Sequence, residues 1–295
     1  MSKTEFLSVA LTEAFIKLIA RQTGLEIRER DEVDLSEKIF LRMKALNILF
    51  PEEYYKFLGY STIESYQEWQ KLVLLLTNLE SYFFRDKEQF NLLRDRILPE
   101  LIQSKEHNKT LRICSAGCST GEEPLSIAIL LKELIPDLEQ WNLMILGVDI
   151  NQEALKKARE GIYTPWSLRS IDPEIMQRYF LHINNQYHLD LQIKQMVKFK
   201  YINLVKDSFN EHDEMRDMDL IICRNVFIYF EASAIAKVLD KFNQILQASG
   251  YLITGHTELC GQDLSHFETK LFPESLVYIK KTFDKQNERT FLSQL

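Results

Sequence analysis

The chain has 295 residues, of which 45% are hydrophobic and 27% are charged. This composition is typical of a globular protein with one large domain or two, and it excludes a disordered or fibrous chain. The formal net charge of −7 gives the molecule as a whole no electrostatic footprint for a nucleic-acid backbone, so we expect no nucleic-acid partner.

The four cysteines have neither the paired spacing of a zinc site nor the density of a disulfide framework, so we expect reduced thiols and no metal. The N-terminus lacks the features of a signal peptide. No stretch of the sequence reaches the roughly 18 consecutive apolar residues of a spanning helix. We therefore expect a cytoplasmic protein that does not insert into the membrane.

Residues 1–76 show apolar positions at helical spacing and no strand pattern, which predicts a small all-α N-terminal domain. In the first helix, the apolar residues Leu7, Leu11 and Phe15 recur at four-residue spacing. Gly24 is expected to end this helix. A second helix is expected to open at Asp34, with Glu37 as its capping-box partner. A third is expected over residues 61–76, with Ser61 and Glu64 as its start signal. The polar face of the second helix, with Lys38, Arg42 and Lys44, is expected to be exposed.

Residues 110–283 alternate short apolar strands with helical stretches, which predicts βαβ units and a mostly parallel sheet. The expected strands are 111–115, 143–149, 220–223 and 251–255, with a final strand at 275–279, and the expected helices are 122–134, 152–160 and 232–247. Alternation at 187–189 and 197–201 predicts an inserted β-hairpin within 182–200. Residues 77–109 are expected to form a linker and a segment that covers the cofactor, and 284–295 a loosely held polar tail.

A glycine loop follows the first of these strands, which ends at Ser115, and leads into a helix that begins at Glu122. Gly117 within the loop allows positive φ and close approach of the backbone to a ligand. Glu122 and Glu123 stand where the pyrophosphate of a dinucleotide would bind, and they would repel it. Either carboxylate can instead accept hydrogen bonds from the ammonium group of a methionine moiety, so the loop favours S-adenosylmethionine over NAD.

The next strand ends at Asp149, 28 residues after Gly121, where an acidic side chain can bind both ribose hydroxyls of a nucleoside. The alternative role for Asp149 is to cap the following helix. Asn151 is already well placed for that role. The loop and the acidic residue together therefore indicate a nucleoside cofactor.

Seven segments, which keep their order over about 180 residues, resemble the glutamate methyltransferases of chemotaxis receptors, the CheR family. They are residues 81–86 (SYFFRD), 115–124 (SAGCSTGEEP), 148–151 (VDIN), 179–180 (YF), 203–204 (NL), 223–230 (CRNVFIYF) and 255–258 (GHTE). The resemblance implies a Rossmann-like S-adenosylmethionine methyltransferase sheet, mostly parallel with an antiparallel last strand. One departure is Leu79, which stands where the family often has asparagine; Asn78 lies one place earlier.

The resemblance also implies the roles of the site residues. Ser81 and Arg85 would lie near the methionine end of the cofactor, and Glu122 or Glu123 would contact its amino group. Asp149 would bind the ribose, and Asn203 and Leu204 would lie at the adenine. Arg224 and Asn225 would line the opposite wall, with Tyr229 near the methyl group. The implied substrates are glutamate side chains on the cytoplasmic helices of chemoreceptors. In this family's context, the basic face with Lys38, Arg42 and Lys44 would instead contact the acidic methylation region of a receptor. The products would be a glutamyl methyl ester and S-adenosylhomocysteine, and we expect the enzyme to be a monomer.

Methyl transfer to a carboxylate is an in-line displacement on a group that is already ionised at neutral pH, so no general base is needed. Catalysis can then come from holding the reacting oxygen, carbon and sulfur collinear. Arg85 is assigned to orienting a carboxylate, and Tyr229 to orienting it or lining the methyl channel. His256 and Cys118 are interpreted as structural.

Three alternatives remain open from the sequence. A methyltransferase of the same fold could act on another protein or on a small carboxylic acid. A non-catalytic regulator could bind S-adenosylmethionine or S-adenosylhomocysteine as a sensor. A Rossmann oxidoreductase would bind NAD, and the paired glutamates argue against it.

Overall fold

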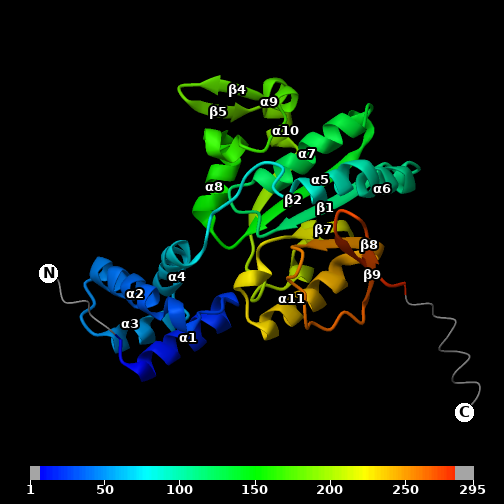
Figure 1. Ribbon diagram of the computed structural model, residues 1–295. Coiled ribbons are helices and arrows are strands. Elements are labelled where there is room, and N and C mark those ends of the chain that lie inside the picture. Colours follow the sequence, from blue (N-terminus) through cyan, green and yellow to red (C-terminus); the bar gives the residue numbers. More distant parts are fainter. Residues whose placement is uncertain (1–6, 283–295) are drawn as a thin grey trace, which may run out of the picture.

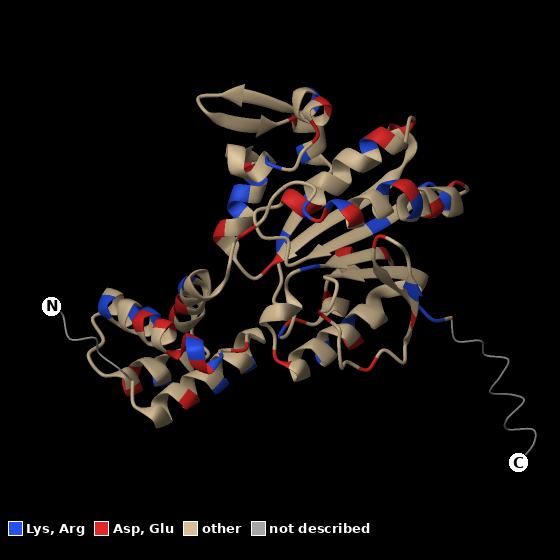
Figure 2. Cartoon of the chain, viewed as in Figure 1, with Lys and Arg blue, Asp and Glu red and all other residues tan. Residues whose placement is uncertain are grey.

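The computed structural model describes residues 7–282 and consists of a group of N-terminal helices beside a larger α/β unit (Figure 1). Acidic and basic residues are interspersed along the outer helices, whereas the central strands carry few of either (Figure 2). Among the described residues, no helix is both long enough and apolar enough to cross a membrane. The expected polar tail, 284–295, lies outside the described residues.

Four helices make up the N-terminal part: α1 (Val9–Thr23), α2 (Glu32–Leu46), α3 (Pro51–Leu58) and α4 (Ile63–Leu76). The expected end of the first helix is confirmed, because Gly24 follows α1 with a φ of 83°. Phe15, Ile39, Tyr54 and Leu72 are fully buried and form the centre of a separate hydrophobic core.

Three sequence expectations in this part were wrong. Helix α2 begins at Glu32, directly after a 3₁₀ turn, so Asp34 lies inside the helix and forms no capping box. Helix α4 is capped by Thr62, whose hydroxyl oxygen accepts a hydrogen bond from Ser65 N. Arg42 is not exposed, because it forms two 2.7 Å hydrogen bonds to Glu68, a buried carboxylate on α4 that requires a partner.

The α/β part is built on a seven-stranded sheet of order β6-β2-β1-β7-β8-β10-β9. Its strands are β1 (Thr110–Ala116), β2 (Asn142–Asp149), β6 (Val197–Tyr201), β7 (Met218–Cys223), β8 (Leu246–Thr254), β9 (Phe267–Leu271) and β10 (Leu276–Lys280). The first five in spatial order are parallel, and β10 is antiparallel to β8 and β9. The predicted fold class is confirmed.

Helices cover both faces of this sheet. The core on one face joins β1, β2 and β7 to α7 (Glu122–Leu134) and to a helical stretch made of α5 (Lys87–Leu92), a π-turn (Leu93–Ile97) and α6 (Leu98–Lys105). The core on the other face joins the same strands to α11 (Ala232–Ile245). Helix α8 (Gln152–Glu160) lies against β2 and β6. The region expected to be a linker therefore contributes a buried helix.

The insertion between α8 and β6 forms a second, three-stranded sheet of order β3-β5-β4. It contains β3 (Ile162–Tyr163), α9 (Pro173–Tyr179), β4 (Phe180–Ile183), β5 (Gln186–Leu189) and α10 (Leu191–Gln195). The remaining short turns are Glu29–Asp31, Leu138–Gln140, Pro165–Leu168, Phe209–Glu211, Asp213–Met215 and Phe227–Tyr229.

The inserted hairpin is confirmed, but its expected composition was wrong. Residues 197–201 form β6, the edge strand of the main sheet, which pairs in parallel with β2. The hairpin strands are β4 and β5, and Asn184 and Asn185, with φ of 48° and 62°, make the turn between them. A half-buried edge strand and a hairpin strand share the same alternation, so periodicity alone did not separate them.

Candidate active site

A pocket lies at the carboxyl ends of β1, β2, β6 and β7, the edge at which doubly wound sheets bind their ligands. About 750 Å³ of this region is free of protein atoms, part of it open to solvent. Its lining comprises Thr23, Leu25, Val73, Leu76, Thr77, Asn78, Leu79, Gly117, Ser119, Asp149, Ile150, Ile202, Asn203, Leu204, Asn225, Val226, Tyr229 and Phe230.

The glycine loop forms the floor of this pocket. Gly117 has a φ of 73°, and a Cβ at this position would lie 2.3 Å from Val226 Cγ2. The N–H groups of Gly117 and Cys118 both donate to the Val148 carbonyl, at 2.8 and 3.0 Å, which fixes the loop against the end of β2. Gly121 has a φ of 92° and begins α7, where a Cβ would meet Ala158 Cβ at 2.7 Å. Both glycines are required by the backbone and by close packing.

Asp149 reaches the pocket from the end of β2. Its two carboxylate oxygens accept hydrogen bonds from Ser119 N at 2.7 Å and Asn151 N at 2.8 Å. Burial raises the pKa of Asp149, although these backbone N–H groups act in the opposite direction. Asn151 Oδ1 accepts from Ala154 N and caps α8, as expected, so the Asp149 carboxylate is not needed as that cap.

The two glutamates at the start of α7 do not line the pocket. Glu122 is buried and accepts hydrogen bonds from the Thr120 hydroxyl at 2.7 Å and the Ser167 hydroxyl at 3.1 Å. Glu123 accepts from Ser115 Oγ at 2.8 Å and pairs with Arg224. A carboxylate has about four lone-pair sites, so each retains capacity for a further donor.

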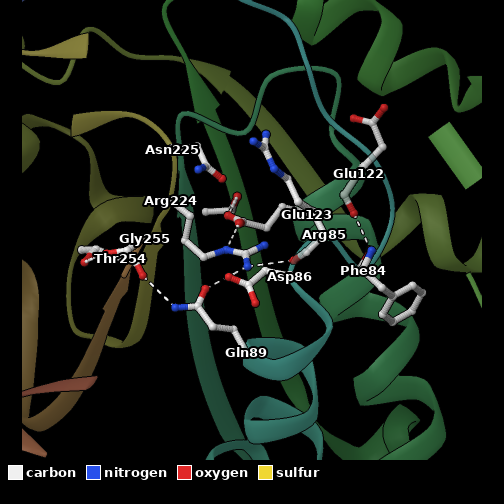
Figure 3. A network of polar contacts seen from close by, with 12 residues as sticks. Phe84, Arg85, Asp86, Gln89, Glu122, Glu123, Arg224, Asn225, Thr254 and Gly255 are labelled. Carbon is white, nitrogen blue, oxygen red and sulfur yellow. Dashed lines mark hydrogen bonds and ion pairs between the residues drawn. The ribbon is translucent and has the colours of Figure 1, made fainter. Parts of the chain in front are cut away.

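Arg224 is the centre of a buried polar network (Figure 3). It donates to the Glu123 carboxylate at 2.7 Å, to the Arg85 carbonyl at 2.8 Å and to Gln89 Oε1 at 2.9 Å. Gln89 in turn donates to the Thr254 carbonyl and to Ser275 Oγ. Arg224 does not line the pocket. It ties the segment around Arg85 to the ends of β7 and β8.

The turn after β7 carries Asn225 and Tyr229, which both line the pocket. Asn225 has a φ of 58°, and Tyr229 is 40% exposed, with its hydroxyl accepting from Asn78 Nδ2 at 3.3 Å. The turn is held by Glu258, a buried carboxylate that accepts from the N–H groups of Asn225, Ile228 and Gly255 at 3.1, 3.2 and 2.6 Å. Burial raises the pKa of Glu258. Sequence reasoning missed its role, although the GHTE segment contains it.

The segment 79–86 crosses above the glycine loop. Phe83 is fully buried and makes edge contacts with Tyr163 and Phe180, at centroid distances of 4.8 and 5.0 Å. The Arg85 guanidinium donates to the Glu80 carbonyl at 2.9 Å. In Figure 3 its side chain points away from Gln89. Neither Ser81 nor Arg85 lines the pocket.

One wall of the pocket comes from the N-terminal helices. Thr23 and Leu25 line it, and Leu25 forms an antiparallel bridge with Phe230. Glu26 N donates to the Tyr229 carbonyl at 2.7 Å, and Asn203 Nδ2 donates to the Gln22 carbonyl at 2.8 Å. Sequence reasoning missed this wall, because no local signal indicates that two segments some 200 residues apart pair with each other.

The structure thus divides the residues expected at the site into two groups. The six that line the pocket are Gly117, Asp149, Asn203, Leu204, Asn225 and Tyr229. The five that lie outside its lining are Ser81, Arg85, Glu122, Glu123 and Arg224. Within residues 7–282, no group of three or more His, Cys, Asp or Glu side chains is arranged to hold a metal ion.

A doubly wound sheet with a glycine loop after β1 and an acidic residue at the end of β2 belongs to the class of α/β folds that bind a nucleoside-containing cofactor at this edge. The family described as "CheR methyltransferase, SAM binding domain" matches residues 79–274. The chain therefore belongs to the CheR methyltransferase family, and it is a methyltransferase enzyme.

Relatives cover most of the chain. The protein is 32% identical over 260 residues to chemotaxis protein methyltransferase 2 of Vibrio cholerae, covering 86% of this chain and 89% of the relative. It is 32% identical over 247 residues to the chemotaxis protein methyltransferase of Borreliella burgdorferi, covering 82% and 86%. For the Salmonella typhimurium enzyme of that name, the identity is 29% over 265 residues, covering 88% and 86%.

Proposed function

We propose that the protein transfers the methyl group of S-adenosylmethionine to glutamate side chains on the cytoplasmic helices of chemotaxis receptors. The observation that carries this proposal is the family match over residues 79–274, which include all six of the expected site residues that line the pocket, together with relatives named chemotaxis protein methyltransferases. The products are a glutamyl methyl ester and S-adenosylhomocysteine. We further propose that the enzyme acts in the cytoplasm as a monomer.

The pocket residues fit the nucleoside part of this cofactor. Asp149 offers an ionisable carboxylate held by two backbone N–H groups, so its remaining lone pairs can accept from both ribose hydroxyls. Asn203 and Leu204 are assigned to the adenine. Thr23 adds a polar contact and Leu25 an apolar one from the N-terminal part of the chain. Glu122 or Glu123, at the start of the helix that follows the glycine loop, is assigned to the amino group, because each carboxylate retains capacity for a further donor.

The bound cofactor supplies an electrophilic methyl group on a positively charged sulfur. The chain's own residues have to exclude water and hold the acceptor carboxylate in line with that methyl group. Tyr229 and Asn225 both line the pocket and Tyr229 is 40% exposed, so we assign both to the side at which an acceptor enters. Arg85 is assigned to orienting the carboxylate, because its planar guanidinium can donate two parallel hydrogen bonds.

The domain division proposed from the sequence has structural support. The N-terminal helices α1 to α4 enclose a hydrophobic core of their own, while two other cores lie on the faces of the sheet. We propose residues 1–76 as the helical domain and 110–283 as the methyltransferase domain.

The decisive experiment is incubation with radiolabelled S-adenosylmethionine and receptor-containing membranes. The proposal expects label on the receptor that is released as methanol by base, and a large loss of labelling for Asp149→Asn and Arg85→Ala. Cys260→Ser, a change at an exposed position away from the pocket, is the matched control. Base-stable label would indicate another acceptor group. Calorimetric binding of S-adenosylhomocysteine without any turnover would indicate the non-catalytic sensor instead.

A further inference from the structure

Arg169 lies in a surface stack between two aromatic rings. It follows the short turn Pro165–Leu168, and its guanidinium carbon is 3.6 Å from the Tyr82 ring centroid and 4.0 Å from the Trp166 centroid. The same guanidinium donates to the Trp166 carbonyl at 2.6 Å and to Glu80 Oε1 at 2.6 Å. Trp166 is 62% exposed, so burial of apolar surface alone does not explain this arrangement.

The stack holds the segment that carries Arg85. Arg85 donates to the carbonyl of Glu80, the residue whose carboxylate pairs with Arg169. The Arg85 guanidinium lies on the Tyr82 ring as well, 5.7 Å from its centroid. Glu80 and Tyr82 therefore each contact both arginines, and they connect the two side chains directly.

The backbone of the same segment is fixed on the same turn. Phe83 N donates to the Ser167 carbonyl at 2.9 Å, and the Ser167 hydroxyl donates to the buried Glu122 carboxylate at 3.1 Å. Residues 80 to 85 are thus held against residues 166 to 169 by one backbone hydrogen bond, one ion pair and one ring stack.

Arg85 has few other constraints. Among residues 7–282 its guanidinium forms one hydrogen bond, to the Glu80 carbonyl, and no ion pair. None of Glu80, Tyr82, Trp166 and Arg169 lines the cofactor pocket. A change in the stack is therefore transmitted to the Arg85 side chain without removing any group from the pocket.

We propose that Arg169 is a positioning residue for the methyl transfer: it orients Arg85, through Glu80 and Tyr82, toward the acceptor carboxylate. The inference rests on the proposed function, in which Arg85 orients that carboxylate. Arginine is suited to this place because its planar fork can stack on two rings while donating in plane. Lysine would keep the charge but neither the stack nor the two directed hydrogen bonds.

The test is a kinetic comparison on receptor membranes, with S-adenosylhomocysteine affinity measured by calorimetry. Arg169→Ala should lower kcat/KM for receptor methylation by on the order of tenfold, because a small misplacement of a catalytic group costs between a few fold and a hundredfold. Its affinity for S-adenosylhomocysteine should stay within about twofold of wild type. Arg169→Lys should not restore the rate. Arg178→Ala, which removes an exposed arginine on the neighbouring α9, is the matched control and should leave kcat/KM unchanged.

A double variant separates positioning from general stabilisation. If Arg169 acts through Arg85, Arg169→Ala should have no further effect on kcat/KM in an Arg85→Ala background. Additive losses, recovery of the rate by Arg169→Lys, or a parallel loss of S-adenosylhomocysteine affinity would each overturn the inference. If Arg169→Ala lowers the melting temperature, Glu80→Gln replaces it: this variant removes the ion pair, keeps the Glu80 carbonyl and should lower kcat/KM in the same direction, and an unchanged rate would overturn the inference.

The two proposals fail in different ways. If Arg85→Ala methylates receptors at the wild-type rate, the role of Arg85 in the proposed function fails, and the positioning role of Arg169 fails with it. If Arg85→Ala is impaired and Arg169→Ala is not, the proposed function stands and only the role of Arg169 is refuted.

Discussion

Replacement of Glu123 by alanine should leave a positive charge without its partner inside the protein. Glu123 accepts hydrogen bonds from Arg224 Nε at 2.7 Å and from Ser115 Oγ at 2.8 Å, and both donors would lose their acceptor. The Arg224 side chain is only 4% exposed and that of Glu123 14%, so water cannot readily replace the carboxylate. We therefore expect a substantial loss of stability.

The size of the loss follows from this burial. Removing one partner of a buried ion pair costs about 3–5 kcal/mol. Arg224 would keep two acceptors, the Arg85 carbonyl and Gln89 Oε1, which places the cost near the lower end. A loss of about 3 kcal/mol lowers the folding equilibrium constant on the order of a hundredfold. Glu133, on the same helix, pairs with Arg178 at side-chain exposures of 32% and 53%, and such a pair contributes about 0–1 kcal/mol. Glu133 also accepts a hydrogen bond from the Tyr179 hydroxyl, which contributes about 1 kcal/mol, so its removal should still cost less than that of Glu123.

The assay is urea unfolding of wild type, Glu123→Ala and the control Glu133→Ala, followed by circular dichroism. The double variant Glu123→Leu with Arg224→Met should be more stable than Glu123→Ala, because it removes the unpaired charge as well. The reasoning would be refuted if Glu123→Ala and Glu133→Ala lost the same free energy of unfolding, or if the double variant were the least stable of the set.

Four further predictions concern the pocket and a helix cap. Asp149→Asn should weaken S-adenosylhomocysteine binding by about tenfold or more, because hydrogen bonds to a charged acceptor contribute about 1.5–3 kcal/mol. In the wild type, burial raises the pKa of Asp149. The affinity for S-adenosylhomocysteine should therefore fall on acidification at a higher pH than it would with an exposed aspartate, because the protonated carboxyl no longer accepts from both ribose hydroxyls. Gly117→Ala should lower cofactor affinity and stability together, because its φ is 73° and its Cβ would lie 2.3 Å from Val226 Cγ2. Thr62→Ala should cost about 1 kcal/mol of stability through loss of the cap on Ser65 N, with cofactor affinity unchanged.

Calorimetric measurement of S-adenosylhomocysteine affinity between about pH 4.5, which lies above the usual pKa of an aspartate, and about pH 8 checks the first two outcomes. Asp149→Asn should show a flatter pH dependence than wild type, and an equally steep one would assign the titration to another group. Thermal unfolding checks the glycine and cap variants. Normal cofactor affinity in Gly117→Ala would contradict the close approach of Val226 to the loop.

Local signals in the sequence were sufficient for the parts of the site that lie on single strands. Gly117 and Asp149 each stand directly after or at the end of a buried parallel strand, and neighbouring carboxyl ends meet at one edge of the sheet. The resemblance carried Asn203, Asn225 and Tyr229 to the same edge. These residues could be predicted because the position of each depends on a single strand or on the turn that directly follows it.

The remaining features depend on tertiary partners that a single segment does not reveal. Glu123 pairs with Arg224, which lies 101 positions later in the sequence, so the local sequence around Glu123 does not show whether its carboxylate faces a ligand or this arginine. The strand 197–201 has the alternation of a hairpin strand, and only the free edge of β2 determines where it pairs. The wall formed by Thr23 and Leu25 likewise requires the bridge to Phe230.

The bridge between Leu25 and Phe230 limits how freely the N-terminal helices and the sheet can be exchanged between related proteins. Gly24 and Phe230 pack so closely that a Cβ on Gly24 would lie 2.6 Å from Val205 Cγ2 and 3.3 Å from the Phe230 ring. A chimaera that joined these N-terminal helices to the sheet of a relative would have to match this contact as well as the chain connection. Exchange of the helices to change acceptor preference would therefore alter cofactor affinity too, and recombination between relatives is expected to succeed only when the two surfaces are exchanged together.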